Sequence, residues 1–173
     1  MAGTDLGATL LRVSILYITT HPQVHNSLLH EFERFGLLPA PDVESVISMA
    51  VATSMPYLQA CIKECLRINP PFCGLLEKVV PPGGDILPDG RFMPEGTHIG
   101  ISFWGMMRDP AVFGDDTDVF RPERWLARHQ TSKDQLKLME KSLECVFSPG
   151  RYTCLGKDIA ILQVNKVIVE VRA

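Results

Sequence analysis

The residues from Phe147 to Gly156 read FSPGRYTCLG, which places one cysteine, Cys154, between two glycines and beside an arginine. The apolar run that follows predicts a helix that starts at about Cys154 and continues to the end of the chain. A helix start stabilises a thiolate through free backbone N–H groups and the helix dipole. Gly150 and Gly156 leave room for a flat ligand, and Arg151 offers a positive charge to an anionic group. The stretch therefore predicts a soft metal ligand or a nucleophile.

Two other interpretations of this cysteine are weaker. A lone cysteine is most often an ordinary buried thiol, but the neighbouring glycines and arginine argue against that here. Zinc is disfavoured because no second Cys or His lies within three or four residues of Cys154. Elsewhere, Cys61 and Cys65 are four residues apart and could share a soft metal ion, but they lie on the apolar face of a predicted helix. We therefore expect them to pack in the core.

A second group of residues could form an ion pair. Glu64 and Arg67, in ECLR, are three residues apart and share one face of a predicted helix, so the two charges can pair. Most such pairs lie on solvated surfaces and contribute only a few tenths of a kcal/mol. Arg124, in FRPERW, is a third charge that could join them. The acidic residues 115, 116 and 118 could suggest calcium, but the spacing of an EF-hand is missing and a turn is the better interpretation.

The composition indicates an ordinary globular chain. Its 173 residues lie in the range of one domain, and the net charge of −3 with no Lys/Arg-rich run argues against nucleic acid as a partner. Five cysteines without a secretory signal indicate reduced thiols. Residues 6–19 are apolar, but Arg12 interrupts them and they are too short to span a bilayer. Both ends of the chain lie inside helical patterns, which predicts a fragment.

Helical periodicity and breaker residues give the expected elements. Pro22, Gly36 and the Asn69-Pro70-Pro71 run mark helix boundaries, and a region rich in proline and glycine follows. The fold class is therefore mainly α with a small β-sheet region. The expected helices are residues 2–19, 22–35, 55–68 and 154 onward, with short or weak helical pieces at 43–50 and 132–143, and the expected strands lie within 77–80 and 97–103, ahead of a loop at 109–122.

Four motifs together resemble a known family. AGTD at residues 2–5, ECLR at 64–67, FRPERW at 120–125 and FSPGRYTCLG at 147–156 occur in the order that is typical of the cytochrome P-450 family, the heme-thiolate monooxygenases. The connecting sequence PPGGDILPDGRFMPEGTHIG also looks like fungal members. The resemblance covers essentially the whole chain. It implies that residues 1–173 are the C-terminal part of a P-450 domain, from the oxygen-side long helix to the helix after the heme cysteine.

The resemblance implies roles for the residues around the cysteine. Cys154 would be the axial thiolate of the heme iron, which favours O–O cleavage. Phe147 would pack beside the cysteine loop, with Gly150 and Gly156 giving backbone clearance. Lys78 falls where the family often places an arginine against a heme propionate.

Further roles are implied outside this loop. Glu64, Arg67 and Arg124 match the structural triad, which serves folding and heme retention. Asp5 matches the acid of the oxygen-side helix, the catalytic residue that helps to deliver protons to dioxygen. Arg151 could serve a second propionate.

Three positions depart from the family pattern. The family commonly has a threonine after the acid, and this chain has Leu6 there. Ser148, followed by Pro149, stands where glycine is usual. Tyr152 stands where an arginine is often found, two residues before the cysteine.

The resemblance implies a monooxygenase that inserts one oxygen atom from O2 into a small apolar organic substrate. Electrons would come from a separate NADPH-dependent reductase, since the chain has no GxGxxG motif. Full-length microsomal relatives lie on the cytosolic face of the endoplasmic reticulum membrane through an N-terminal anchor, which we do not find in this chain. Two alternatives stay open: a peroxide-using or isomerising heme-thiolate enzyme, which Leu6 would suit, and a truncated fragment without catalytic activity.

Overall fold

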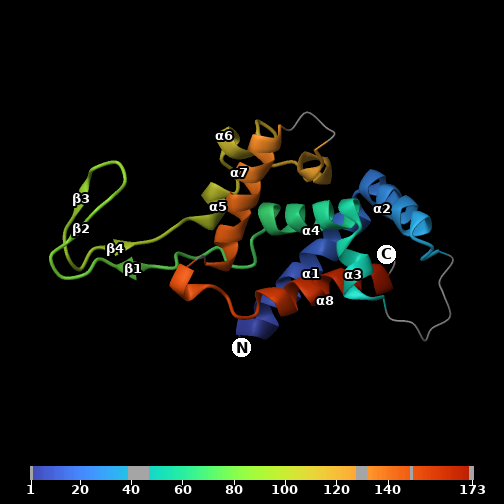
Figure 1. Cartoon of the computed structure of the whole chain (residues 1–173), viewed down its shortest axis with the longest axis horizontal. Coiled ribbons are helices and arrows are strands. Elements are labelled where there is room, and N and C mark those ends of the chain that lie inside the picture. The colour runs from blue at the N-terminus through green and yellow to red at the C-terminus, as the bar shows by residue number, and fades with distance from the viewer. Residues whose placement is uncertain (1, 39–46, 128–131, 149, 172–173) are drawn as a thin grey trace.

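The computed structural model describes residues 2–38, 47–127, 132–148 and 150–171. The helices gather in one body, and a hairpin of short strands extends away from it (Figure 1). This confirms the expected fold class, mainly α with a small β part. The helices are α1 (Ala2–Thr20), α2 (Pro22–Arg34), α3 (Met49–Thr53), α4 (Pro56–Ile68), α5 (Phe103–Met106), α6 (Pro110–Phe113), α7 (Lys133–Glu144) and α8 (Lys157–Val171), with 3-10 helices η1 (Pro122–Trp125), η2 (Cys145–Phe147) and η3 (Gly150–Tyr152).

Helix α4 is the centre of the core. Nine of its 13 residues are buried, and it packs against α1, α2, α3, α7, α8 and η1. Helices α1 and α8 lie side by side below it (Figure 1). Because α4 carries Glu64 and Arg67, this central position takes both charged side chains out of water. Among the described helices, none combines the length and the hydropathy needed to cross a membrane.

The starts of the helices follow from proline and from short polar side chains. Proline lies in the first turn of α2, α4 and α6. The N–H groups of a first turn have no acceptor within the helix, so the N–H that proline lacks is not needed there. Ser48, Ser102, Asp109 and Ser132 each accept a hydrogen bond from a backbone N–H in the first turn of the following helix. These caps satisfy donors that would otherwise have no partner.

The strands form two antiparallel pairs along one excursion of the chain. Strand β1 (Lys78–Val79) pairs with β4 (His98–Ile99), with Lys78 opposite Ile99. Farther out, β2 (Asp85–Ile86) pairs with β3 (Phe92–Met93). Gly90, at φ 86°, lies between β2 and β3, where the chain reverses. The chain thus leaves the helical body after α4 and returns to it at α5.

Most expected helices are confirmed to within a residue or two, and three bounds are corrected. The strand expected within 97–103 ends at Ile99, because Ser102 caps α5 and Phe103 already belongs to that helix. The loop expected at 109–122 contains α6, because Asp109 and Pro110 provide a helix start. Of the helical piece expected at 43–50, residues 43–46 lie outside the described residues; the helix there is α3, which begins after the Ser48 cap.

Candidate functional site

Cys154 lies in a turn in front of α8. Its backbone N–H donates to the carbonyl oxygen of Phe147 at 2.9 Å, and its carbonyl accepts from the N–H of Lys157 at 3.3 Å. Helix α8 begins at Lys157, so the predicted start at Cys154 is wrong by three residues. The physical reason is that the chain must first turn back to Phe147 before it can become helical. The thiol is therefore exposed on a loop just ahead of the helix.

The loop depends on backbone conformations that side chains disfavour. Gly150 has φ 85°, and a Cβ added there would meet nothing within 4 Å. A Cβ at Gly156 would lie 3.8 Å from the Cys154 sulfur. Ser148 has φ 54° and is the one non-glycine residue of the described chain in the left-handed region. This explains why a glycine would suit that position, since glycine adopts positive φ without a steric cost.

The Glu64 carboxylate is the centre of a buried cluster. Arg67 donates to both of its oxygens, at 2.9 and 2.8 Å, and Arg124 donates to Oε1 at 3.0 Å. Two further donors were not expected from the sequence: the indole N–H of Trp125 at 2.8 Å and the backbone N–H of Arg121 at 2.9 Å. Glu64, Arg67 and Arg124 are at most 1% exposed, so the three charges expected to pair do so without water.

The two arginines connect α4 to the chain between α5 and η1. Arg67 donates to the carbonyl oxygens of Met107 and Thr117, at 3.0 and 2.7 Å. Arg124 donates to the carbonyl oxygen of Phe113 at 2.6 Å. A planar guanidinium with five donors suits such a set of fixed acceptors. The cluster therefore holds a long irregular segment against the central helix.

Asp116 extends this cluster toward the surface. Its carboxylate accepts from Arg124 at 3.0 Å and pairs with Arg121 at 2.7 Å. Burial acts to raise the pKa of Asp116, but the charges of Arg124 and Arg121 and the hydrogen bond from Arg124 outweigh it and hold the pKa below its usual value. Residues 115–118 form a turn, as expected. Asp118 pairs with Arg108 at 3.0 Å.

Lys78 and Tyr152 meet at the edge of the cysteine loop. The Lys78 Nζ lies 3.3 Å from the centre of the Tyr152 ring, although the two residues are on β1 and η3. The contact brings Lys78, a predicted site residue, to the segment that carries Cys154. Arg151, the other predicted cation, precedes Tyr152 in η3 and is exposed.

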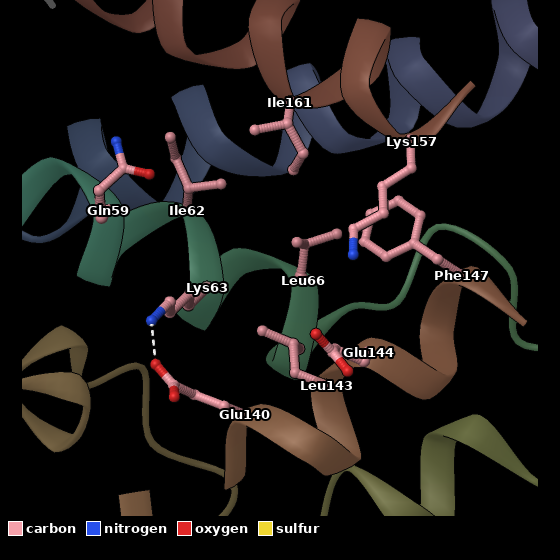
Figure 2. A pocket seen from close by; sticks show the side chains of 10 residues that line it. All are labelled: Gln59, Ile62, Lys63, Leu66, Glu140, Leu143, Glu144, Phe147, Lys157 and Ile161. Carbon is pink, nitrogen blue, oxygen red and sulfur yellow. Dashed lines mark hydrogen bonds and ion pairs between the residues drawn. The ribbon is translucent and has the colours of Figure 1, made fainter. Parts of the chain in front are cut away.

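A groove of about 380 Å³ lies behind the cysteine loop, between α4, α7 and α8 (Figure 2). Leu66 and Ile161 contribute to its apolar lining. At its rim, Lys63 and Glu140 form an ion pair at 2.6 Å, which joins α7 to α4. Figure 2 shows the ring of Phe147 beside the Lys157 side chain at the other end. Phe147, a predicted site residue, thus lines this groove with its ring, while its carbonyl oxygen accepts from the N–H of Cys154.

Asp5 and Leu6 lie near the start of α1, which packs against α8. Asp5 is exposed and Leu6 is half-buried, while the Thr9 hydroxyl donates to the Asp5 carbonyl at 2.9 Å. A Cβ at Gly7 would lie 3.6 Å from the side-chain oxygen of Gln163 on α8, so small residues bring the two helices close there. Among the described residues, no group of three or more His, Cys, Asp or Glu side chains is arranged to hold a metal ion.

The sequence did not point to two helix-to-helix contacts that support this site. Glu31, a buried residue of α2, accepts from the backbone N–H groups of Tyr57 and Leu58 at 2.8 and 2.7 Å. Gln59 of α4 donates to the buried Asn165 of α8 at 2.6 Å. Helix α4 has no side-chain cap of its own, so the N–H groups of its first turn need an acceptor from elsewhere in the chain. In the sequence this missing cap is the one sign that a residue such as Glu31 is needed there.

Comparison with known proteins gives one consistent result. The family model described as Cytochrome P450 matches residues 1–171. The chain is 43% identical, over 98% of its length, to the cytochrome P450 monooxygenase ABA1 of Pyricularia oryzae. It is 38% identical over 96% of its length to the cytochrome P450 monooxygenase pkfB of Emericella nidulans, and 36% identical over 98% to the pisatin demethylase of Fusarium vanettenii. These matches cover 32%, 31% and 30% of the relatives, so the chain spans about a third of their length.

Proposed function

The chain belongs to the cytochrome P450 family, and on that premise we propose that it is the heme-binding, C-terminal part of a fungal-type heme-thiolate monooxygenase. In this proposal residues 1–173 are part of one P450 domain, and Cys154 is the axial ligand of the heme iron. The observation that carries the proposal is the geometry of the loop. An exposed thiol is held by the hydrogen bond from Cys154 to Phe147, with Gly150 and Gly156 on either side.

The residues around Cys154 fit a flat, partly anionic group. Gly150 is surrounded by open space, which leaves the backbone accessible. Leu155 is 100% exposed, an apolar side chain that lacks any cover in the described chain. Lys78 and Arg151 place two cations near the same loop, which suits carboxylates at the edge of a porphyrin. A heme with a thiolate ligand requires a thiol for the iron, apolar contacts for the porphyrin ring and cations for its carboxylates. The exposed Leu155, the thiol of Cys154 and the two cations match these three requirements.

Each group then has a part in the proposal. A heme with a thiolate ligand supplies the activation of dioxygen and favours O–O cleavage. The Glu64, Arg67 and Arg124 cluster fixes the segment between α5 and η1 against α4, which serves folding and retention of the cofactor. Asp5 is exposed at the start of α1, and in this proposal its side chain helps to deliver protons to the reaction.

For the whole protein, we propose a monooxygenase that inserts one oxygen atom from O2 into a small apolar organic substrate. Electrons come from a separate NADPH-dependent reductase, and the protein works at the cytosolic face of the endoplasmic reticulum membrane. The support for the monooxygenase reaction comes from relatives, which are named as P450 monooxygenases and as a demethylase.

Reconstitution tests the proposal. The 173-residue chain is mixed with hemin, reduced with dithionite and exposed to CO. We expect the Soret band characteristic of thiolate ligation, and we expect Cys154→Ser to abolish it. Cys73→Ser is the matched control, because Cys73 is also an exposed thiol. A wild-type chain that gives no such band would support a fragment without heme function. A Cys154→Ser variant that keeps the band would refute Cys154 as the ligand.

A second candidate is a peroxide-using or isomerising heme-thiolate enzyme. It is favoured by Leu6, whose side chain cannot donate a hydrogen bond to oxygen. In the enzyme completed with the N-terminal part of a relative, Leu6→Thr tests it. Improved coupling of NADPH consumption to product supports the monooxygenase. Unchanged coupling, together with turnover driven by peroxide alone, supports the second candidate.

A further inference from the structure

The contact between Lys78 and Tyr152 joins two positions at which the resemblance to the P450 family implies an arginine. The Lys78 Nζ lies 3.3 Å from the centre of the Tyr152 ring, well inside the range of a cation–π interaction. Both residues are exposed, Tyr152 to 62%, and the ammonium lies over one face of the ring. The contact spans β1 and η3 and therefore sets the position of a charge relative to the cysteine loop.

The charge at Lys78 is not neutralised by the strand that carries it. The acidic residue next to it in the sequence is Glu77, which directly precedes β1. The Glu77 carboxylate pairs with His98 at 2.9 Å. Among the described residues, no carboxylate forms an ion pair with Lys78 or with Arg151. Lys78 and Arg151 therefore lie beside Tyr152 without a carboxylate partner among the described residues.

We propose that Tyr152 is a positioning residue for Lys78, and that the pair receives one carboxylate of the bound porphyrin. This rests on the proposed function, since it assumes heme at Cys154. The aromatic ring limits the rotamers of a flexible lysine side chain, so less conformational freedom is lost when the carboxylate binds. Lysine is a point charge without the planar fork of arginine, and the ring supplies the orientation that a guanidinium has by itself. Tyr152 thus compensates through Lys78 for the arginine that its own position lacks.

The contact can be measured without heme. Protons above an aromatic face are shifted upfield by the ring current, so we expect an upfield shift of the Lys78 ε-methylene protons in NMR spectra of the free chain. Tyr152→Leu should remove this shift, and Tyr152→Phe should keep it because the ring remains. An unshifted Lys78 signal in the wild-type chain would overturn the proposal.

The role toward the porphyrin is tested by the rate at which heme is lost. Hemin is transferred from the loaded chain to an excess of apomyoglobin, and the experiment is repeated with hemin dimethyl ester, whose carboxylates are blocked. For hemin we expect roughly two- to five-fold faster loss in Tyr152→Leu, the size expected of an exposed cation–π contact, and wild-type loss in Tyr152→Phe. For the dimethyl ester, Tyr152→Leu and the wild-type chain should lose the porphyrin equally fast.

Two further variants separate positioning from packing. Lys78→Met should lose hemin roughly ten-fold faster, and adding Tyr152→Leu to it should change nothing more, because the ring acts through the lysine. If Tyr152→Leu accelerates loss of hemin and of the dimethyl ester equally, the ring only packs and the proposal falls. In that case the thiolate Soret band still supports heme at Cys154; loss of that band in the wild-type chain would refute the proposed function and this inference together.

Discussion

The indole N–H of Trp125 donates to the Oε2 atom of Glu64 at 2.8 Å, inside a cluster that water does not reach. Trp125→Phe leaves that acceptor with one donor fewer and a small void. We expect a loss of about 2 kcal/mol in the free energy of unfolding, measured by urea denaturation. Trp104→Phe is the matched control, because Trp104 is 46% exposed. An equal loss in the two variants would show that the hydrogen bond to Glu64 contributes nothing.

The Glu31 carboxylate replaces the missing cap of α4. Its two oxygens accept from the N–H groups of Tyr57 and Leu58, so Glu31→Gln turns an amide group toward one of these donors. We expect a loss of roughly 1–3 kcal/mol, because a buried N–H then has no acceptor. Glu33→Gln, at an exposed position of the same helix, should change the stability very little. The prediction fails if both variants unfold at the same urea concentration as the wild-type chain.

Ser148 holds a left-handed backbone conformation, so Ser148→Gly should stabilise the chain. The gain is about 1 kcal/mol at most, because glycine relieves the steric cost but loses more freedom on folding. Ser142→Gly, inside α7, should instead destabilise the chain by about 0.5–1 kcal/mol. The melting temperatures of the two variants and of the wild-type chain distinguish these outcomes. A melting temperature of Ser148→Gly below that of the wild-type chain would show that the left-handed conformation of Ser148 carries no strain.

The helices could be predicted because their boundaries are local. Proline at the starts of α2 and α4, and Asn69 with two prolines after α4, act on their immediate neighbours, and the bounds came out within a residue or two. The start of α8 could not be predicted, because it depends on the hydrogen bond from Cys154 back to Phe147. Apolar periodicity gives no information about such a turn.

For the charged residues of the site, too, local contacts could be predicted from the sequence and long-range contacts could not. The pairing of Glu64 with Arg67 follows from helical spacing, and the motif resemblance supported Arg124 as the third member of the cluster. The carbonyl oxygens that Arg67 binds lie 40 and 50 residues farther along the chain, in irregular segments. The contact between Lys78 and Tyr152 is likewise set by how the chain leaves the helical body through β1, which has no signature in the sequence.

Asp116 should make the free energy of unfolding decrease at acidic pH. Its pKa is held below the usual value of about 3.9, so the folded chain binds this proton less readily than the unfolded chain. The stabilisation is present above the unfolded pKa and is lost as the pH falls through the folded pKa. Urea denaturation between pH 7 and pH 2 should show this loss in the wild-type chain and a flatter profile in Asp116→Asn. Asp134→Asn, at a side chain that is 97% exposed, should keep the wild-type profile, and identical profiles for all three would contradict the prediction.

Four of the five cysteines should react with a thiol reagent in two groups, two slowly and two fast. Burial raises the pKa of Cys65 to about 12, and burial together with the nearby Cys65 and three glutamates raises the pKa of Cys61 well above its usual value. At pH 8 roughly one Cys65 in ten thousand is then a thiolate, and neither thiol is accessible. We expect both to react with dithionitrobenzoate only at the rate of unfolding, as the core packing of these residues requires.

Cys73 and Cys154 are exposed and should form the fast group in the same assay. Cys73→Ser and Cys154→Ser should each remove one fast equivalent, which assigns the two thiols. Added hemin should then protect Cys154 and leave Cys73 reactive, because Cys154 is the proposed ligand of the heme iron. Equal protection of both thiols would mean that hemin binds without regard to the loop, and fast reaction of Cys61 or Cys65 would mean that α4 is not the closed centre of the fold.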